Sequence, residues 1–167
     1  MPTDFFTLLR RDHVDIQKEL TLLLDPIATA AELRGSLDGV RLGLTAHAEA
    51  EDIVLGRFES MPQLDALVAQ ARAAHLAQEG ALSALVSARP FTAAWRERAH
   101  HLRDLVHDHA VEEEQFLLPG LRLHAPRGVY DSLAGAFATE RLRQLAMLQP
   151  SAPMYIPDSA LVEARGA

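Results

Sequence analysis

Residues 109–119 read HAVEEEQFLLP, and residues 47–52 read HAEAED. Each run places a glutamate four residues after its first histidine, so the two side chains share one face of a helix. Another histidine precedes each run with 33 residues between them, His13 before the earlier run and His75 before the later one. The pattern His-x(33)-His-x(3)-Glu therefore occurs twice, with an offset of 62 residues. All of these residues fall where predicted helices bury apolar side chains, which points to a metal site.

Apolar residues recur at alternating steps of three and four, as on the buried face of a bundle helix, in two segments of the first half. The first segment starts after Thr3 or Asp4, carries its stripe at positions 6, 9, 13, 16, 20 and 23, and stops before Pro26. The second starts at the capping box Thr29-x-x-Glu32, and its stripe is 37, 40, 44, 47, 51, 54 and 58. Polar residues of the repeat occupy the middle of both stripes.

Two further segments show the same periodicity. The third follows a break at residues 60–62, has Pro62 in its first helical turn, and carries its stripe at 64, 68, 71, 75, 78, 82 and 85. The fourth starts after Thr92, and its stripe is 95, 99, 102, 106, 109, 113, 116 and 120. We interpret Phe58, Trp95 and Phe116, which lie on these stripes, as core residues.

The four segments predict an all-α protein, an up-down four-helix bundle with an additional C-terminal helix and a tail. The composition agrees, because 49% hydrophobic residues with only 5% aromatic residues favour helices over sheets. The additional helix is expected at 128–148, with apolar residues at 129, 133, 137, 142 and 145, on one end or side of the bundle. A chain of 167 residues fits one domain, so we assign 1–149 to the bundle and 150–167 to the tail.

Charge and cysteine content exclude several classes of function. The net charge is −7 without a long block of either sign, so neither DNA nor RNA is an expected partner. The chain has no cysteine, which excludes disulfides and thiolate metal sites and leaves His, Asp and Glu as metal ligands. The first six residues lack the features of a signal peptide, and no apolar stretch is long enough to span a bilayer. We expect a cytoplasmic protein without a membrane partner.

Six polar residues of the stripes form the candidate metal site: His13, His47, Glu51, His75, His109 and Glu113. A buried carboxylate without a partner costs several kcal/mol, and the stripes contain no lysine or arginine to neutralise the two glutamates. In an up-down bundle the four histidines reach a similar depth, so the six groups converge. They suit two cations, each held by two imidazoles, with the carboxylates bridging. Nitrogen and oxygen ligands of this kind are compatible with iron, manganese or zinc.

The chain resembles the hemerythrin-like domains, also called HHE cation-binding domains, over roughly residues 4–120. The resemblance rests on the runs at 47–52 and 109–119, on Asp12-His13 and on the lone His75. It implies a four-helix bundle with two non-heme iron ions joined by an oxo or hydroxo bridge. It also implies which residues bind them: His13 and His47 for one iron, His75 and His109 for the other, and Glu51 and Glu113 between the two.

The third and fourth segments differ from those of oxygen-carrying hemerythrins. Those proteins have a second histidine four residues after the third-helix histidine, where this chain has Glu79, and an aspartate five residues after the fourth-helix histidine. Here Glu113 follows His109 by four residues. A centre with four histidines is more carboxylate-rich, which resembles the branch of the family linked to iron or oxygen sensing and redox chemistry. Two interpretations of Glu79 stay open, a seventh terminal ligand and a surface or supporting group.

Three functions are compatible with such a site. The preferred one is the binding or sensing of oxygen, nitric oxide or redox state, and the alternatives are a peroxidase or catalase-like enzyme and an iron storage or handling protein. The expected partner is thus a small ligand such as oxygen, nitric oxide or peroxide, and no catalytic residue is assigned. The four other histidines, at 100, 101, 107 and 124, lie off the stripe or in a loop and are expected to be solvated.

Overall fold

The computed structural model describes residues 3–149, and the tail predicted at 150–167 lies outside the described residues. Within residues 3–149 every regular element is helical, so the predicted all-α class is confirmed. The helices are α1 (Phe5–Leu23), α2 (Ala30–Leu55), α3 (Asp65–Ser87), α4 (Ala93–Glu112), α5 (Leu118–His124) and α6 (Arg127–Leu148). A 3₁₀ turn over Gly56–Phe58 follows α2, and a π-helical turn over Glu113–Leu117 joins α4 to α5.

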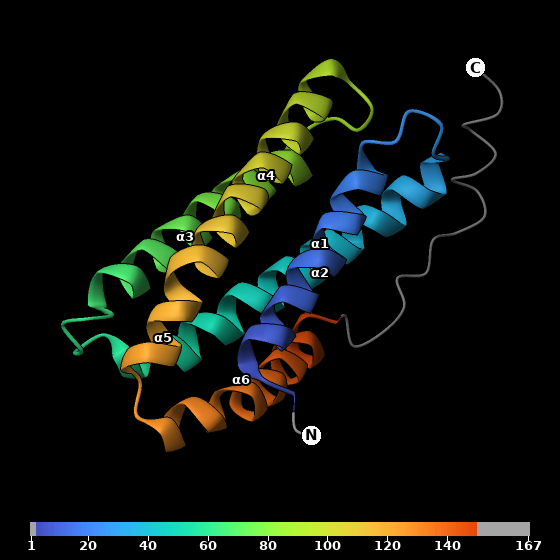
Figure 1. Ribbon diagram of the computed structural model, residues 1–167. Coiled ribbons are helices and arrows are strands. Elements are labelled where there is room, and N and C mark those ends of the chain that lie inside the picture. The colour runs from blue at the N-terminus through green and yellow to red at the C-terminus, as the bar shows by residue number, and fades with distance from the viewer. Residues whose placement is uncertain (1–2, 150–167) are drawn as a thin grey trace, which may run out of the picture.

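The first four helices form an up-down bundle. α1 lies beside α2, α3 lies beside α4, and contacts of α1 with α4 and of α2 with α3 close the bundle (Figure 1). After the short α5, the orange to red helix α6 turns back and packs against α2 and α1 (Figure 1). The predicted four-helix bundle with an additional C-terminal helix is therefore confirmed.

Two helix starts follow from the capping residues. The side chain of Thr29 accepts a hydrogen bond from the backbone N–H of Glu32, whose carboxylate accepts one from the backbone N–H of Thr29. This capping box satisfies N–H groups that the first turn of α2 leaves without a helical partner. Thr92 caps α4 by accepting a hydrogen bond of 3.2 Å from the backbone N–H of Trp95.

The start of α3 differs from the prediction. Pro62 lies in the turn before α3 and not in its first helical turn, because the helix begins at Asp65. The carbonyl of Met61 accepts hydrogen bonds from the backbone N–H groups of both Leu64 and Asp65, and these bonds close the turn ahead of the helix.

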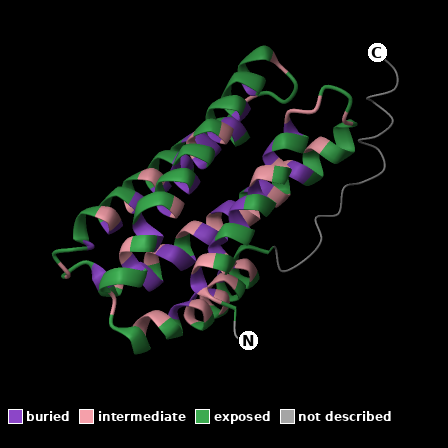
Figure 2. Ribbon diagram, in the orientation of Figure 1, coloured by how far each residue is buried: buried purple, intermediate pink, exposed green. Residues whose placement is uncertain are grey.

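The apolar core consists of two clusters on either side of a polar layer. One lies towards α5 and α6 and includes Phe5, Leu9 and Phe58, whereas the other lies towards the α1–α2 and α3–α4 loops and includes Leu20 and Trp95. Figure 2 shows the buried residues on the helix faces that turn towards one another. Because each fully buried leucine or phenylalanine contributes about 1.5–3 kcal/mol, these clusters can offset the cost of the polar residues between them.

Helical structure continues past Pro119, because the π turn and α5 follow α4 without a break. Proline lacks an N–H, and its ring crowds the carbonyl four residues earlier, so the wider π turn ahead of Pro119 lets the helix continue. A π turn holds an extra residue and rotates the following positions. Leu117 is therefore buried, whereas Phe116 is 58% exposed. The interpretation of Phe116 as a core residue is wrong for this reason.

Candidate metal centre

The polar layer between the two core clusters consists of the six residues of the sequence repeat. They come from four helices and the π turn: His13 from α1, His47 and Glu51 from α2, His75 from α3, His109 from α4, and Glu113 from the π turn. Each of the six residues is between 0% and 5% exposed. Glu113 is the first residue of the π turn, a local irregularity that is frequent at functional sites. The structure thus brings all six predicted site residues together.

Each glutamate of the layer lies between two histidines on different helices. The separations of carboxylate oxygen and imidazole Nε2 are 3.3 Å for Glu51–His47, 3.8 Å for Glu51–His75, 3.1 Å for Glu113–His13 and 3.4 Å for Glu113–His109. Each carboxylate therefore joins a histidine of the α1–α2 pair to a histidine of the α3–α4 pair.

The donor atoms form two overlapping groups. One comprises Glu51, His75, His109 and Glu113, and the other comprises His13, His47 and Glu113, with the atoms of each group within 4.8 Å of one another. The Nε2 atoms of His75 and His109 are 2.9 Å apart. Glu113 belongs to both groups, which is the arrangement expected of a bridging carboxylate.

Most donor atoms of the layer are buried without a hydrogen bond. Within the part of the chain that the structure describes, this holds for Nε2 of His13 and His47 and for both carboxylate oxygens of Glu51 and of Glu113. Metal ions with bonds of about 2.1 Å place neighbouring ligand atoms about 3.0 Å apart in octahedral and about 3.4 Å apart in tetrahedral coordination. The separations in the layer, from 2.9 to 3.8 Å, include these values, so the spacing of the donor atoms is compatible with shared metal ions.

Burial and neighbouring charges give His13, His47 and His109 different pKa values. Burial lowers the pKa of His13 to about 4 and that of His109 to about 3, so both are neutral at pH 7, the form that binds a metal. Burial also opposes the charged form of His47, but its hydrogen bond with Asp12 and the nearby negative charge of Glu51 outweigh burial and raise the pKa of His47 to about 9. A metal ion at His47 must therefore displace a proton at neutral pH.

The two glutamates respond to burial in opposite ways. Burial favours the neutral form of Glu51, but its contacts with Glu113 and His47 outweigh this effect and hold its pKa well below the usual range. For Glu113, burial and the nearby charge of Glu51 act together and raise the pKa well above the usual range. Two carboxylates this close retain a proton unless a cation takes its place.

Three of the four imidazoles rest against a further carboxylate. The contacts to Nδ1 are 3.2 Å for His47–Asp12, 2.7 Å for His75–Asp52 and 3.2 Å for His13–Glu114. A carboxylate that accepts a hydrogen bond from Nδ1–H fixes the tautomer, directs Nε2 into the layer and makes it a better ligand. Sequence reasoning did not assign these three acidic residues a role. Each is the sequence neighbour of a layer residue, and this adjacency is the signal that could have found them.

The sequence model of one protein family, the hemerythrin HHE cation binding domain, matches residues 4–121 of this chain. This chain belongs to that family. The resemblance inferred from the two histidine–glutamate runs is thereby confirmed, and a buried His/Glu cluster able to hold metal agrees with it. Comparisons with curated proteins and with solved structures give no match. Because the match ends within α5, helix α6 lies beyond the family's domain in this chain.

Other polar residues of this hemerythrin-like domain lie outside the layer. Glu79 is exposed and belongs to neither group of donor atoms, so its position favours the surface interpretation. Gln78 is 2% exposed, and neither atom of its amide group has a hydrogen bond among the described residues. The histidines at 100, 101, 107 and 124 are exposed, as predicted.

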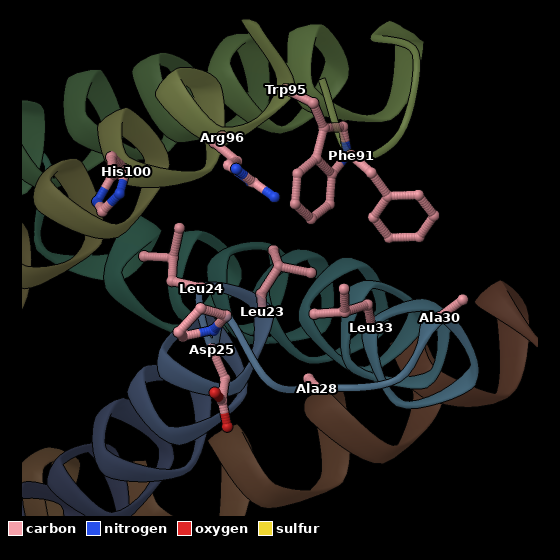
Figure 3. Close-up of a pocket in the computed structure, with 11 residues that line it drawn as sticks. Leu23, Leu24, Asp25, Ala28, Ala30, Leu33, Phe91, Trp95, Arg96 and His100 are labelled. Atoms are coloured by element: carbon pink, nitrogen blue, oxygen red, sulfur yellow. The ribbon is translucent and has the colours of Figure 1, made fainter. Parts of the chain in front are cut away.

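Cavities in the described part of the chain reach the polar layer of the hemerythrin-like domain from outside. A groove of about 990 Å³ between α1 and α4 extends to His13, and a cavity of about 190 Å³ between α2 and α3 extends to His75 and Gln78. Another cavity, of about 360 Å³, lies beside the loops at one end of the bundle, where Trp95 faces Leu23 (Figure 3). That cavity includes none of the six layer residues, so it is separate from the candidate centre. None of the helices in the described part of the chain is both long and apolar enough to cross a membrane.

Proposed function

We propose that this hemerythrin-like domain holds two iron ions in its polar layer and uses them to bind or sense oxygen, nitric oxide or redox state. In this proposal His13 and His47 bind one ion, His75 and His109 bind the other, and Glu51 and Glu113 bridge them. Manganese and zinc are the alternative ions, because the nitrogen and oxygen donor set accepts all three. The cytoplasmic location expected from the sequence stays a prediction.

One observation carries the proposal. Six donor atoms from His13, His47, Glu51 and Glu113 are buried without a hydrogen bond to any residue of the described range 3–149, although buried polar atoms in folded proteins nearly always have one. Two of these residues are glutamates, and the layer contains no lysine or arginine that could neutralise them. Two cations supply the missing partners and the missing charge together.

The surroundings of the layer support a role for small ligands. Two iron ions supply a change of oxidation state and coordination positions for a diatomic ligand. The chain's own residues provide the access, because the cavity of about 190 Å³ between α2 and α3 has room for a small molecule beside His75. Gln78 offers a buried hydrogen-bond donor in this cavity, and the apolar clusters on both sides limit the entry of water.

The first test measures metal content per chain by elemental mass spectrometry, together with the ultraviolet–visible spectrum of the same sample. We expect close to two iron ions per chain. His47→Ala is expected to lower the metal content, and His124→Ala, which changes an exposed histidine, is expected to leave it unchanged. Equal metal content in the wild type and both variants, or a wild type without metal, contradicts the proposal.

A second test separates the three functions. The chemically reduced protein is mixed with nitric oxide or oxygen under anaerobic control, and a saturable spectral change at about one ligand per centre is expected for binding or sensing. Sustained consumption of peroxide by the loaded protein, abolished in His47→Ala, would favour the enzyme instead. Rapid loss of iron to a chelator without any spectral response to the gases would favour iron handling.

A further inference from the structure

Helix α6 covers one side of the polar layer, although it lies beyond the family's domain. Its residues Leu133, Phe137 and Arg141 recur every fourth position and therefore share one helix face. Leu133 and Phe137 are fully buried, and the ring of Phe137 meets that of His47 edge-on, with 5.7 Å between centroids and an interplanar angle of 80°. α6 thus packs directly against a proposed metal ligand.

Arg141 continues this buried face with a positive charge. Its Nε donates a hydrogen bond of 2.6 Å to Oδ2 of Asp12, and the same oxygen lies 3.2 Å from Nδ1 of His47. Asp12 is only 7% exposed, and a carboxylate at that depth needs a cation or several donors. Arg141 supplies a charge and a donor, so it holds Asp12 in the position from which Asp12 orients His47.

The other two supporting carboxylates have weaker contacts with arginine. Arg10 lies 3.6 Å from Glu114 with its side chain 64% exposed, and Arg72 lies 4.0 Å from Asp52 with its side chain 39% exposed. The side chain of Arg141 is 28% exposed, and its contact is the shortest of the three. Because solvent weakens exposed ion pairs, the Arg141–Asp12 contact is expected to hold its carboxylate in place more strongly than the other two contacts do.

Asp12 also breaks the internal repeat. An offset of 62 residues relates Asp52 to Glu114, so the carboxylates that contact His75 and His13 occupy equivalent positions of the repeat. The position equivalent to Asp12, however, is Ala74. His109, the counterpart of His47, therefore has no carboxylate from the corresponding position of α3. The two halves of the layer have equivalent ligands and different support.

We propose that Arg141 is a positioning residue of the metal centre, which acts through Asp12 to fix the imidazole of His47 and makes the His13–His47 half the tighter of two metal positions. This inference rests on the proposed function, because it requires two metal ions in the layer. It makes α6 a part of the site and not only a cover over the bundle.

The test is a titration of the metal-free full-length protein with Co²⁺, followed by calorimetry and by visible absorption. The wild type is expected to bind two ions, one more tightly than the other. Asp12→Asn and Arg141→Gln are each expected to weaken the tighter ion by roughly 10–100-fold and to leave the second ion unchanged. Arg143→Gln is the matched control, because Arg143 lies on the same helix and pairs with Glu140, away from the layer.

Two more variants distinguish positioning from a purely structural role. Arg141→Lys restores a cation near Asp12 and is expected to recover part of the lost affinity. The double variant Asp12→Asn/Arg141→Gln is expected to bind Co²⁺ no more weakly than Asp12→Asn alone, because Arg141 acts through Asp12. Additive losses in the double variant, equal weakening of both ions, or wild-type affinity in Arg141→Gln would each overturn the inference while the wild type still binds two ions. A wild type that binds no metal would overturn the proposed function, and this inference with it.

Discussion

Replacing Glu113 with glutamine is expected to stabilise the protein without metal and to destabilise it with metal. Glu113 is 2% exposed, and neither carboxylate oxygen has a hydrogen bond among the described residues. Burial and the charge of Glu51 raise its pKa, so at neutral pH the metal-free fold carries either an unfavourable charge or an unfavourable protonation. Glutamine has nearly the same shape, carries no charge, and can donate a hydrogen bond to Glu51.

The size of the effect follows from the cost of an unsatisfied buried group. That cost is about 1–3 kcal/mol, so the free energy of unfolding of metal-free Glu113→Gln should rise by a similar amount. For a domain of this size the melting temperature should increase by roughly 3–9 °C. The neutral form of Glu113 is favoured in the fold, so its contribution to stability is fully present below pH 4.5 and is lost as pH rises. The advantage of the variant should therefore be absent near pH 4 and grow towards pH 7.

Metal reverses the order of stability. An ion present at a hundredfold excess over its Kd stabilises the fold by about 2.7 kcal/mol, and Glu113→Gln loses a carboxylate shared by both proposed metal positions. Differential scanning fluorimetry of wild type and variant, with and without Fe²⁺ or Co²⁺, measures both effects. Glu112→Gln is the matched control, because Glu112 is exposed and its carboxylate accepts a hydrogen bond from Gln70 on the surface. A lower melting temperature for the metal-free variant at pH 7, or two metal ions bound to it as tightly as to the wild type, would refute the reasoning.

Three further perturbations have defined outcomes. His47→Ala should lower metal content and thermal stability together, whereas His124→Ala should change neither. Elemental analysis and melting curves compare the two variants, and similar metal content and melting curves for both would argue against the layer as a metal site. Because the pKa of His47 without metal is raised to about 9, metal binding at pH 7 should release its proton, so affinity should increase about tenfold per pH unit up to about pH 9. Calorimetry in buffers of different ionisation enthalpy counts the released protons, and a count of zero would contradict this assignment. Leu117→Ala should lower the free energy of unfolding by about 2–5 kcal/mol and Phe116→Ala by less than about 0.5 kcal/mol, since only Leu117 is buried; urea denaturation measures both, and the opposite order would contradict the π turn.

Periodicity predicted the fold well where the helices are regular. The stripe positions of the first three segments, and of the fourth as far as Glu113, are buried except for Phe6 and Leu37, which are half-buried, because a continuous α-helix returns to the same face every three or four residues. The prediction fails at Phe116, immediately after that regularity ends. The π turn adds a residue to the turn, and a pattern that assumes 3.6 residues per turn then points to the wrong side. Pro119 is the local sign of a departure, because proline disfavours a regular α-helical turn, but its presence does not specify a wider turn.

The convergence of the six residues of the candidate site was predictable from the sequence, and the residues that contact them from outside the layer were not. The six layer residues repeat at fixed spacing and lie on apolar stripes, so their convergence followed from helix geometry alone. The contact of Arg141 with Asp12 joins positions 129 residues apart on helices that the sequence does not orient relative to each other. In α6 we assigned the apolar residue at 142 to the face that packs on the bundle. Leu142 is instead 66% exposed, and Arg141 occupies the inward position. The signal that could have indicated this contact is the position of Arg141, four residues after Phe137 on the apolar face of the helix.

The pKa values of His47 and His109 differ because the internal repeat is interrupted at Asp12. These two histidines occupy equivalent positions, each with a glutamate four residues later, and a perfect repeat would give them the same properties. Without metal, however, the pKa of His47 is raised to about 9, whereas burial lowers that of His109 to about 3. Asp12 is a main cause, because it accepts a hydrogen bond from His47 and has Ala74 as its counterpart. A carboxylate that favours a proton on His47 also favours a metal cation there once the proton leaves, so the two proposed metal positions, which have equivalent ligands, are expected to fill in order and not together.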